Sequence, residues 1–331
     1  MNSFTYTRAE DVARAVREAQ ADRAAKFIAG GTNLIDLMKE NVERPSRLID
    51  ITRLPLKEIH SGAGIGLRLG ALATNTDVAC NEEVERRYPL LSKAILAGAS
   101  PQLRNMATVG GNLMQRTRCC YFYDTATPCN KREPKTGCSA IAGFNRAHAI
   151  LGTSGHCIAS HPSDMCVALA ALEAVVRVTG RGGERVIPLA EFHRLPGDTP
   201  HIDTNLRPDE IITGVDLPVK GFAEHHSYLK VRDRASYAFA LVSVAAALEM
   251  NGQTIKESRL ALGGVAHKPW RDRQAETLLN GQRATTENFQ RAAEALLRDA
   301  KGFGHNNFKI ELAKRAIVRT LSQAVSGEEK S

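Results

Sequence analysis

The segment 115–160 interrupts an otherwise regular sequence, and it restricts the folds that the chain can adopt. It reads QRTRCCYFYDTATPCNKREPKTGCSAIAGFNRAHAILGTSGHCIAS, with many turn residues and little apolar periodicity. Stretches of this length without regular structure are uncommon in compact domains unless they are functional or disordered. Five of the seven cysteines of the chain fall between positions 119 and 157. We therefore expect a bound ligand, and not a hydrophobic core, to order this insertion.

The cysteine pattern indicates a metal site. Seven cysteines in 331 residues are too few for a disulfide scaffold. An odd, clustered set in a chain without an N-terminal signal peptide favours metal binding. Cys119, Cys129, Cys138 and Cys157 contain no C-x2-C pair, which argues against a zinc ribbon. Four thiolates in a loop-rich segment fit a [4Fe–4S] cluster, although Cys120 could replace Cys119 as the first ligand.

The charge distribution agrees with a cluster. The chain has a net charge of +8, and residues 101–150 hold seven basic and two acidic side chains. Arg118, Lys131 and Arg132 could offset the negative charge of a cluster. A nucleic-acid face is disfavoured, because only 5% of the residues are aromatic and no recognition helix is evident. Cys80 and Cys166 fall in expected helices, where we expect them to be inert core residues.

Regular elements flank the insertion on both sides. Residues 26–30 and 47–51 predict strands around a helix at 32–40, a small βαβ unit. The RGGE turn at 181–184 predicts a hairpin. Further expected elements are strands at 66–74, 174–180, 210–218, 227–233, 241–250 and 258–265, and helices at 89–99, 162–171 and 308–325. No apolar run is long enough to span a bilayer.

Two glycine turns suggest a phosphate site. The first joins a strand to a helix, where backbone N–H groups beside glycine can face one anion and the helix N-terminus adds positive charge. On spacing alone, an ordinary helix cap after a glycine turn is as good an interpretation as a phosphate site. A second turn, TVGGNL at 108–113, repeats the pattern, so both turns could grip one extended dinucleotide. The first turn comprises Lys26, Phe27, Ile28, Ala29, Gly30, Gly31, Thr32, Asn33 and Leu34.

These motifs together resemble a known family. KFIAGGTNLIDLMK, TVGGNL, IASHPSDM and EIITGVDLP resemble the FAD-binding medium subunit of the xanthine dehydrogenase and carbon monoxide dehydrogenase family of molybdenum hydroxylases. The likeness extends over the whole chain. The insertion, KVRDRASYAFALVSVAAAL and LGGVAHKPWR resemble the FAD-binding subunits of bacterial periplasmic aldehyde oxidoreductases. These subunits, like that of 4-hydroxybenzoyl-CoA reductase, carry a [4Fe–4S] cluster in this insertion.

The resemblance implies an α+β fold with a two-part FAD-binding domain. It places this domain at residues 1–222, divided near residue 60 and carrying the iron–sulfur insertion 115–160. A smaller α+β domain follows at 223–331. The resemblance also assigns residues: Cys119, Cys129, Cys138 and Cys157 would hold the cluster. FAD would contact the nine residues of the first turn, and also Thr108, Gly111, Asn112, Asp164, Ile212 and Lys230.

Three of these assignments have ordinary structural alternatives. Asp164 would hydrogen-bond the cofactor, or it could cap the following helix. Ile212 would pack on the flavin ring, or it could be a strand core residue. Lys230 would lie near the flavin edge, or it could be a solvated lysine on a strand.

The implied function is electron transfer. Electrons would pass from a molybdenum-cofactor large subunit and a [2Fe–2S] small subunit to FAD on this chain, and then to an external acceptor. No catalytic acid–base residues are expected in this chain. The first alternative is a self-contained flavin oxidase with His225 or His226 as its base, and the second is a basic iron–sulfur nucleic-acid-binding protein. Because the N-terminus has no export signal, we expect a partner to carry the chain to the periplasm; otherwise it is cytoplasmic.

Overall fold

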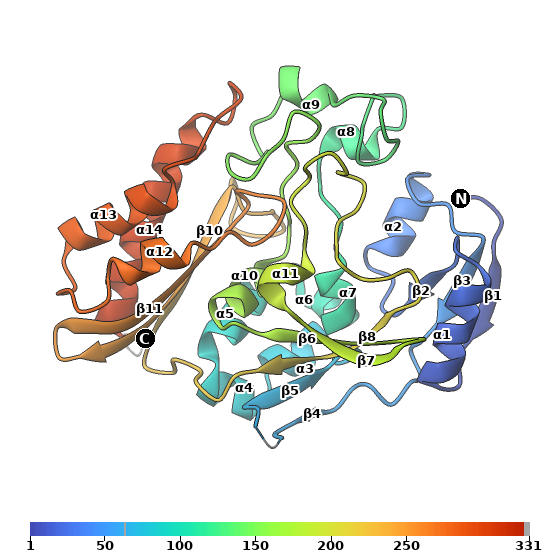
Figure 1. The fold of residues 1–331 in the computed structure, drawn as a ribbon, viewed down its shortest axis with the longest axis horizontal. Coiled ribbons are helices and arrows are strands. Elements are labelled where there is room, and N and C mark those ends of the chain that lie inside the picture. Colours follow the sequence, from blue (N-terminus) through green and yellow to red (C-terminus); the bar gives the residue numbers. More distant parts are fainter. Residues whose placement is uncertain (63, 328–331) are drawn as a thin grey trace.

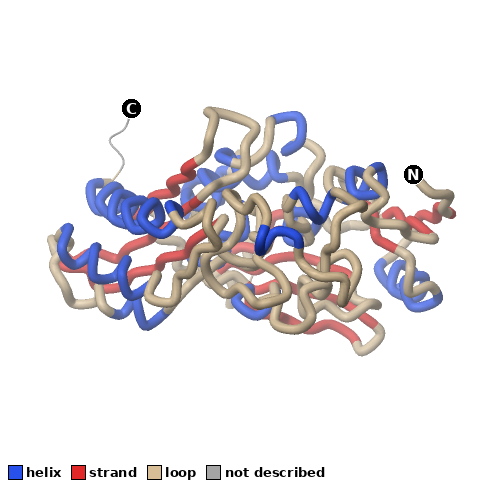
Figure 2. The backbone as a smooth tube through the Cα atoms, turned by 90° about the horizontal axis from the view of Figure 1, so that it is seen from above, coloured by secondary structure: helices blue, strands red, loops and turns tan. Residues whose placement is uncertain are grey.

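The computed structural model describes residues 1–62 and 64–327. It contains three β-sheets arranged across the molecule, with helices packed on them (Figure 1). The insertion, in green, lies above the middle of the molecule between the N-terminal and C-terminal parts. Seen from above, long loops cross the centre of the molecule between the sheets (Figure 2). This arrangement brings loops from distant parts of the chain together.

The N-terminal unit is a small parallel sheet with two helices. Strands β1 (Thr5–Arg8), β3 (Arg47–Asp50) and β2 (Lys26–Ile28) lie in that order, with α1 (Val12–Ala21) and α2 (Leu34–Lys39) between them in sequence. The predicted βαβ unit is therefore confirmed. Helix α1 begins after Asp11, whose side chain accepts a hydrogen bond from the Arg14 N–H.

The second part is built on a five-stranded antiparallel sheet of order β4-β5-β8-β6-β7. The predicted hairpin is confirmed, with Gly180 opposite Gly183. The strand expected at 66–74 ends early, because the chain turns where Ala73 N–H bonds Gly70 O (3.1 Å). The strands are β4 (Ile59–His60), β5 (Leu67–Gly70), β6 (Val175–Gly180), β7 (Gly183–Pro188) and β8 (Ile211–Leu217). The helices are α3 (Asn75–Ala79), α4 (Glu82–Arg87), α5 (Pro89–Ala97), α6 (Pro101–Arg104), α7 (Val109–Leu113), α10 (Asp164–Ala171) and α11 (Leu189–Phe192).

The C-terminal part is an antiparallel sheet of order β11-β10-β9 that is buried on both faces. Val244 and Ala246 of β10 join one core with α13 and α14, whereas Ala245 and Ala247 join another with α5 and α10. Burial of both faces explains why β10 is a continuous apolar run. The elements are β9 (His225–Val231), β10 (Val242–Asn251), β11 (Thr254–Gly263), α12 (Arg273–Thr277), α13 (Thr286–Leu296) and α14 (Phe308–Ser326).

The predicted domain boundary at 222–223 falls in the connection between β8 and β9. It stays a prediction, and the last residues of the predicted C-terminal domain, 328–331, lie outside the described chain. Among the described residues, no helix combines the length and apolar character needed to cross a bilayer.

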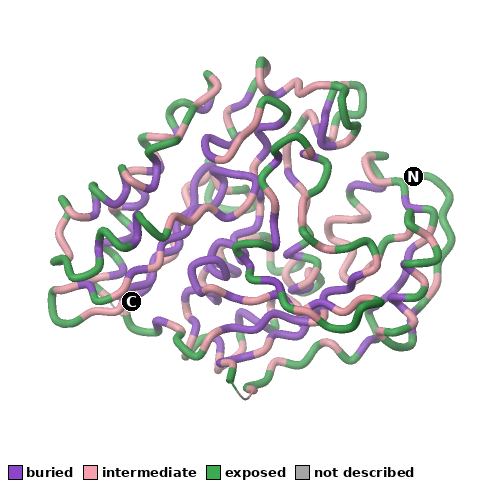
Figure 3. The backbone as a smooth tube through the Cα atoms, in the orientation of Figure 1, coloured by how far each residue is buried: buried purple, intermediate pink, exposed green. Residues whose placement is uncertain are grey.

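The insertion holds little regular structure, as its sequence predicts. Its two helices are single turns, α8 (Cys120–Tyr123) and α9 (Ser139–Ala142). Buried, intermediate and exposed residues alternate over short distances along it (Figure 3). Phe122 and Cys129 pack with Leu37 of α2 in a small cluster, and Ile150 and Leu151 join the core of the C-terminal part. Polar contacts also order the insertion: Arg132 donates to the backbone carbonyls of Tyr121 (2.8 Å) and Phe122 (2.9 Å).

The start of α14 anchors the end of the insertion. The ammonium of Lys309 is fully buried and donates to the carbonyls of Ala147 (3.3 Å), His148 (2.8 Å) and Gly264 (2.6 Å). Asn306 donates to the carbonyl of Ala149 (3.0 Å). Buried carbonyls without a donor are costly, so these two side chains fix the backbone at 147–149.

We expect Lys309→Met to lower the free energy of unfolding by about 1–3 kcal/mol, because it removes one hydrogen-bond donor from each of three carbonyls, two of which keep a weaker one. Denaturant titration of the two proteins measures this difference. Lys301→Met is the matched control, since Lys301 is an exposed lysine close by, and it should change stability by less than about 0.5 kcal/mol. Equal stability of Lys309→Met and wild type would show that this anchor is dispensable.

Candidate functional site

Two cavities meet between the sheets. The N-terminal cavity, of about 600 Å³, lies beside β2 and β8. The central cavity, of about 830 Å³, lies between α10, the insertion and the loop 233–241. Asn33, Gly111 and His161 line both, so the cavities join there. All the predicted cofactor residues line one or both cavities: Lys26, Phe27, Ile28, Ala29, Gly30, Gly31, Thr32, Asn33, Leu34, Thr108, Gly111, Asn112, Asp164, Ile212 and Lys230.

The first glycine turn offers unused hydrogen-bond donors at this junction. Gly31 has a φ of +71°, a conformation that glycine adopts without strain. Within the described chain, the backbone N–H groups of Gly30, Gly31 and Thr32 donate to no other group. The side-chain nitrogen of Asn33 is also buried without a partner, while its oxygen accepts from Arg116 N–H (3.3 Å). Donors grouped in this way suit a ligand rich in acceptor oxygens.

Gly30 packs directly against the segment that precedes the second turn. A Cβ atom at Gly30 would lie 1.8 Å from the carbonyl oxygen of Met106, so a larger residue would force the two segments apart. The two turns therefore lie face to face at the cavity junction. This close approach of two backbones accounts for glycine at this position.

The second turn differs from the first in its hydrogen bonding, and the expectation that both turns hold one dinucleotide stays a prediction. Its residues form α7, capped by Thr108, whose hydroxyl accepts from Gly111 N–H (3.2 Å). Gly110 N–H donates to Ala71 O (2.8 Å) and Asn112 N–H to Thr108 O (2.8 Å). These donors are used inside the fold, so a ligand would meet mainly the side chains and the surface of α7.

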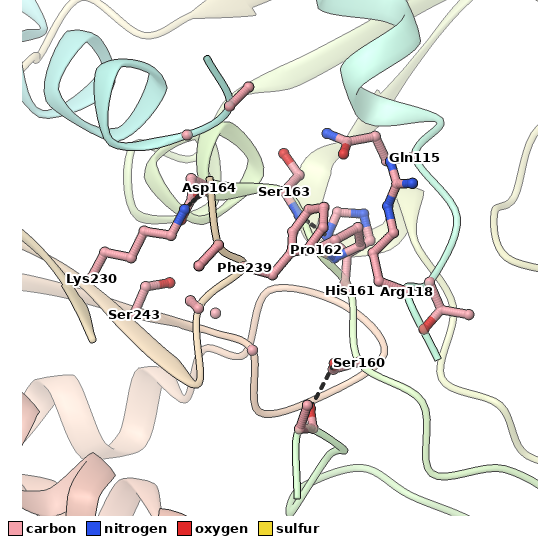
Figure 4. Close-up of a pocket in the computed structure, with 18 of the residues that line it drawn as sticks. Gln115, Arg118, Ser160, His161, Pro162, Ser163, Asp164, Lys230, Phe239 and Ser243 are labelled. Carbon is pink, nitrogen blue, oxygen red and sulfur yellow. Dashed lines mark hydrogen bonds and ion pairs between the residues drawn. The ribbon is translucent and has the colours of Figure 1, made fainter. Parts of the chain in front are cut away.

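Asp164 and Lys230 form a buried ion pair in the wall of the central cavity (Figure 4). Their atoms are 2.8 Å apart, and the side chains are only 8% and 5% exposed. Lys230 also donates to Ala97 O (3.0 Å) at the end of α5. Tyr228 donates to Asp164 (2.6 Å); burial and the carboxylate raise the pKa of Tyr228, which keeps its hydroxyl protonated.

Two of the structural alternatives are excluded by these contacts. Lys230 is buried, so it is not a solvated lysine. Ser163, and not Asp164, caps α10, because its hydroxyl accepts from Cys166 N–H (3.0 Å). The Ser163 hydroxyl also bonds the Asn112 side chain (2.5 Å), which links α10 to α7. Asp164 is therefore free of a capping role.

Ile212 lies apart from this ion pair. It is a buried residue of β8, packed beside α7, and it lines the N-terminal cavity. Lys230 lines the central cavity. The structure therefore places these two predicted cofactor contacts on different sides of the junction.

Buried histidines at the junction were missed by the sequence analysis. Burial lowers the pKa of His193 to about 4, and burial, followed by its neighbour His193, holds the pKa of His161 well below its usual value. Both rings are therefore neutral. His161 lies within IASHPSDM, but its motif gave no indication of a role, and nothing in the sequence singles out His193.

His161, His193 and Cys166 bring potential ligand atoms within 4.8 Å of one another, but their hydrogen bonds disfavour a metal ion. Ser163 N–H approaches His161 Nδ1 (3.4 Å), so that nitrogen is an acceptor and Nε2 carries the proton. His193 Nε2 lies 2.8 Å from Leu113 O and must donate, which leaves Nδ1 as an acceptor. The two remaining atoms form a donor and acceptor pair without a partner in the described chain, suited to a hydroxyl group.

The four predicted cluster cysteines lie in one region of the insertion. Cys129 and Cys138 face each other across an isolated antiparallel bridge. A hydrogen bond from Cys157 lowers the pKa of Cys138 to about 6, and the same contact raises the pKa of Cys157. Cys119 packs against the small cluster that contains Cys129. These pairwise contacts place the four cysteines near one another, and the cluster that they are predicted to hold stays a prediction.

Of the three remaining cysteines, Cys80 alone differs from the expectation. Cys120 is exposed, whereas Cys119 is partly buried and burial raises its pKa to about 12. Cys166 is buried in α10, as predicted. Cys80 is exposed at the end of α3, so its assignment to the core is wrong.

Several basic side chains of the insertion, among them Lys131, Arg116 and Arg118, already form ion pairs. Lys131 forms an ion pair with Asp203, as does Arg116 (2.8 Å). Burial acts to raise the pKa of Asp203, but these two cations outweigh it and lower the pKa to about 2. Arg118 contacts Tyr123 (2.6 Å) and Asp36 (3.3 Å). Lys131 partly opposes the rise in the pKa of Cys157 that Cys138 and burial cause.

The candidate bases for an oxidase lie elsewhere. His225 and His226 are on β9 and line neither of the two cavities. His225 Nδ1 lies 3.2 Å from Ala324 O, and His226 Nε2 lies 2.8 Å from Lys93 Nζ. The structure thus provides no role for either ring beside a bound substrate.

Comparison with known proteins extends over the whole chain. Residues 2–220 match the model of the FAD binding domain in molybdopterin dehydrogenase, and residues 227–324 match the CO dehydrogenase flavoprotein C-terminal domain. The chain is 52% identical to the aldehyde oxidoreductase FAD-binding subunit PaoB of Escherichia coli K12, over 98% of this chain and 99% of that protein. It is 29% identical to the glyceraldehyde dehydrogenase medium chain of Sulfolobus acidocaldarius, over 85% and 82% of the two chains.

The fold is also that of solved structures. Carbon monoxide dehydrogenase from Hydrogenophaga pseudoflava matches with a TM-score of 0.77 and 26% identity over 98% of both chains. Quinoline 2-oxidoreductase from Pseudomonas putida 86 shares the fold, with a TM-score of 0.75 over 98% of both chains. The domain matches, the full-length identity and the paired cavities lead to one assignment: the chain belongs to the FAD-binding medium subunits of the molybdenum hydroxylase family of oxidoreductases.

Proposed function

We propose that this chain is the FAD-binding electron-transfer subunit of a heterotrimeric molybdenum-dependent aldehyde oxidoreductase. The observation that carries the proposal is the 52% identity to an aldehyde oxidoreductase subunit over nearly the whole of both chains. Electrons would reach the chain from a [2Fe–2S] small subunit and a molybdenum-cofactor large subunit, and would leave to an external acceptor. His225 and His226, the candidate bases of a self-contained oxidase, line neither of the two cavities, which favours an electron-transfer role.

The two joined cavities fit an extended dinucleotide. When bound, FAD supplies one-electron and two-electron chemistry. The N–H groups of Gly30, Gly31 and Thr32 and the Asn33 amide would bind phosphate oxygens at the junction. The donor and acceptor atoms left on His161 and His193 would meet a hydroxyl group of the cofactor. In the central cavity, the buried Lys230–Asp164 pair would fix the polar edge of the ring system.

The insertion would hold the second cofactor. A [4Fe–4S] cluster bound by Cys119, Cys129, Cys138 and Cys157 would close loops of nine, eight and eighteen residues, and so order a segment with few apolar contacts. The four thiols would lose their protons on binding iron.

We also propose that a partner carries the chain to the periplasm. Fractionation of the native host tests this directly.

The assembly and the division of labour can be tested by purification from the native host. The tagged chain should copurify with a small [2Fe–2S] protein and a large molybdenum protein, and aldehyde should bleach the flavin of this complex. The isolated chain should keep its flavin unbleached with aldehyde but lose its colour with dithionite. Bleaching of the isolated chain by aldehyde would instead identify a self-contained oxidase.

Flavin binding should depend on Gly30. Because a Cβ there meets the Met106 carbonyl at 1.8 Å, Gly30→Ala should separate the two turns and lower FAD content at least tenfold. Gly155→Ala is the control, since a Cβ at Gly155 meets no atom within 4 Å. The FAD released by acid precipitation measures occupancy and also tests noncovalent binding. Full occupancy in Gly30→Ala, or colour retained in the pellet, would contradict these expectations.

The cluster should depend on the four cysteines. Replacing Cys119, Cys129, Cys138 or Cys157 by Ser should remove about four iron atoms per chain and expose the insertion to protease. Cys120→Ser should keep its iron, because Cys120 is exposed while Cys119 packs inside the site. Iron and acid-labile sulfide analysis of the complex gives the answer. If every variant keeps full iron, the cluster belongs to a partner subunit.

A further inference from the structure

His148 contacts the sulfur of Cys119. Its Nε2 lies 3.1 Å from the Cys119 Sγ, a distance within the range of a hydrogen bond to sulfur. The two residues are separated by 28 others in sequence, so the contact depends on the fold of the insertion. Cys120, the neighbouring alternative, is exposed and has no such contact among the described residues.

The backbone of His148 is fixed by three hydrogen bonds. Its backbone N–H donates to Asn145 O (2.9 Å), and its backbone carbonyl accepts from Lys309 (2.8 Å) and Asn306 (3.3 Å). The ring tilts against Tyr121, with 6.3 Å between the ring centroids. The residue is only 5% exposed. Its position is therefore set by the surrounding fold, as is usual for residues that orient a metal ligand.

We propose that His148 donates an N–H···S hydrogen bond to the Cys119 thiolate of the [4Fe–4S] cluster, and that this bond makes Cys119 the first ligand and raises the reduction potential of the cluster. The inference rests on the cluster proposed above. An iron-bound thiolate has no proton to give, so the ring nitrogen is the donor. Hydrogen bonds to cluster sulfurs stabilise the more negative, reduced state, and thereby raise the potential.

The location of His148 makes this effect relevant to electron transfer. His148 and Cys119 both line the central cavity, the same cavity that contains Lys230 and Asp164. The hydrogen bond therefore lies in the wall of the cavity that would hold the flavin. His148 is a positioning residue, since it acts through Cys119.

The test is a redox titration of the cluster in the intact complex, followed by electron paramagnetic resonance. In His148→Leu, the reduced state should become about tenfold less favoured relative to the oxidised state, which lowers a one-electron potential by about 59 mV. His148→Gln keeps an N–H donor and should recover most of the difference. His156→Leu is the matched control, because His156 is adjacent to Cys157 but is half-exposed, and its side chain pairs with Asp198 and with no sulfur among the described residues. It should leave the potential unchanged.

Each outcome decides the question. A lowered potential in His148→Leu with full iron, recovered in His148→Gln, supports the hydrogen bond. An unchanged potential in His148→Leu overturns it. Loss of the cluster in His148→Leu supports the proposal if His148→Gln retains cluster and potential, and overturns it if His148→Gln loses the cluster too. A wild-type complex without any [4Fe–4S] signal refutes the proposed cluster itself, which is a distinct result.

Discussion

The buried ion pair between Lys230 and Asp164 is the interaction on which the architecture of the site depends. It joins β9 of the C-terminal part to the first residue of α10, and Lys230 also bonds the end of α5. Removing two charges from water is costly, and an apolar pair of similar size would often be more stable. A pair retained in a cavity wall is therefore better explained by what it presents to the cavity than by the stability it adds.

The backbone at the glycine contact is likewise better explained by what it presents to the cavity than by the stability it adds. Gly30 lets the first turn touch the carbonyl of Met106, and Gly31 takes a positive φ that other residues rarely adopt. Together they leave N–H groups that nothing in the described chain satisfies. Unsatisfied donors in a protein interior are expensive, so the fold is arranged for a ligand that supplies the acceptors.

Much of this could be predicted from the sequence, because short motifs encode local chemistry. The strand–turn–helix at Lys26 to Leu34 fixes its own geometry, and the alternation of apolar residues locates the strands. The sequence could not show that Gly110 of the second turn donates its N–H to Ala71 O, since that bond joins segments distant in sequence. The burial of Lys230 was equally hidden, because a lysine on a strand is ordinarily solvated.

The buried histidines were also not predictable from the sequence. His148, His161 and His193 carry no spacing that marks a site, and each acquires its role from a contact made by folding: Cys119 for His148, Ser163 for His161 and Leu113 for His193. A pattern of residues along the chain reports helices, strands and turns. It does not report which single side chain from a distant segment faces a given sulfur or nitrogen atom.

These contacts also give the C-terminal part a function of its own. It contributes none of the predicted phosphate-binding residues, yet β9 supplies Lys230 to the central cavity. The start of α14 supplies Lys309 and Asn306, which hold the carbonyl of His148 and so place its ring beside Cys119. One domain thus positions residues at both proposed cofactors. Because β9 and α14 belong to the same part of the chain, a shift of that part would disturb the Lys230–Asp164 ion pair and the His148–Cys119 contact together, and all four residues line the central cavity.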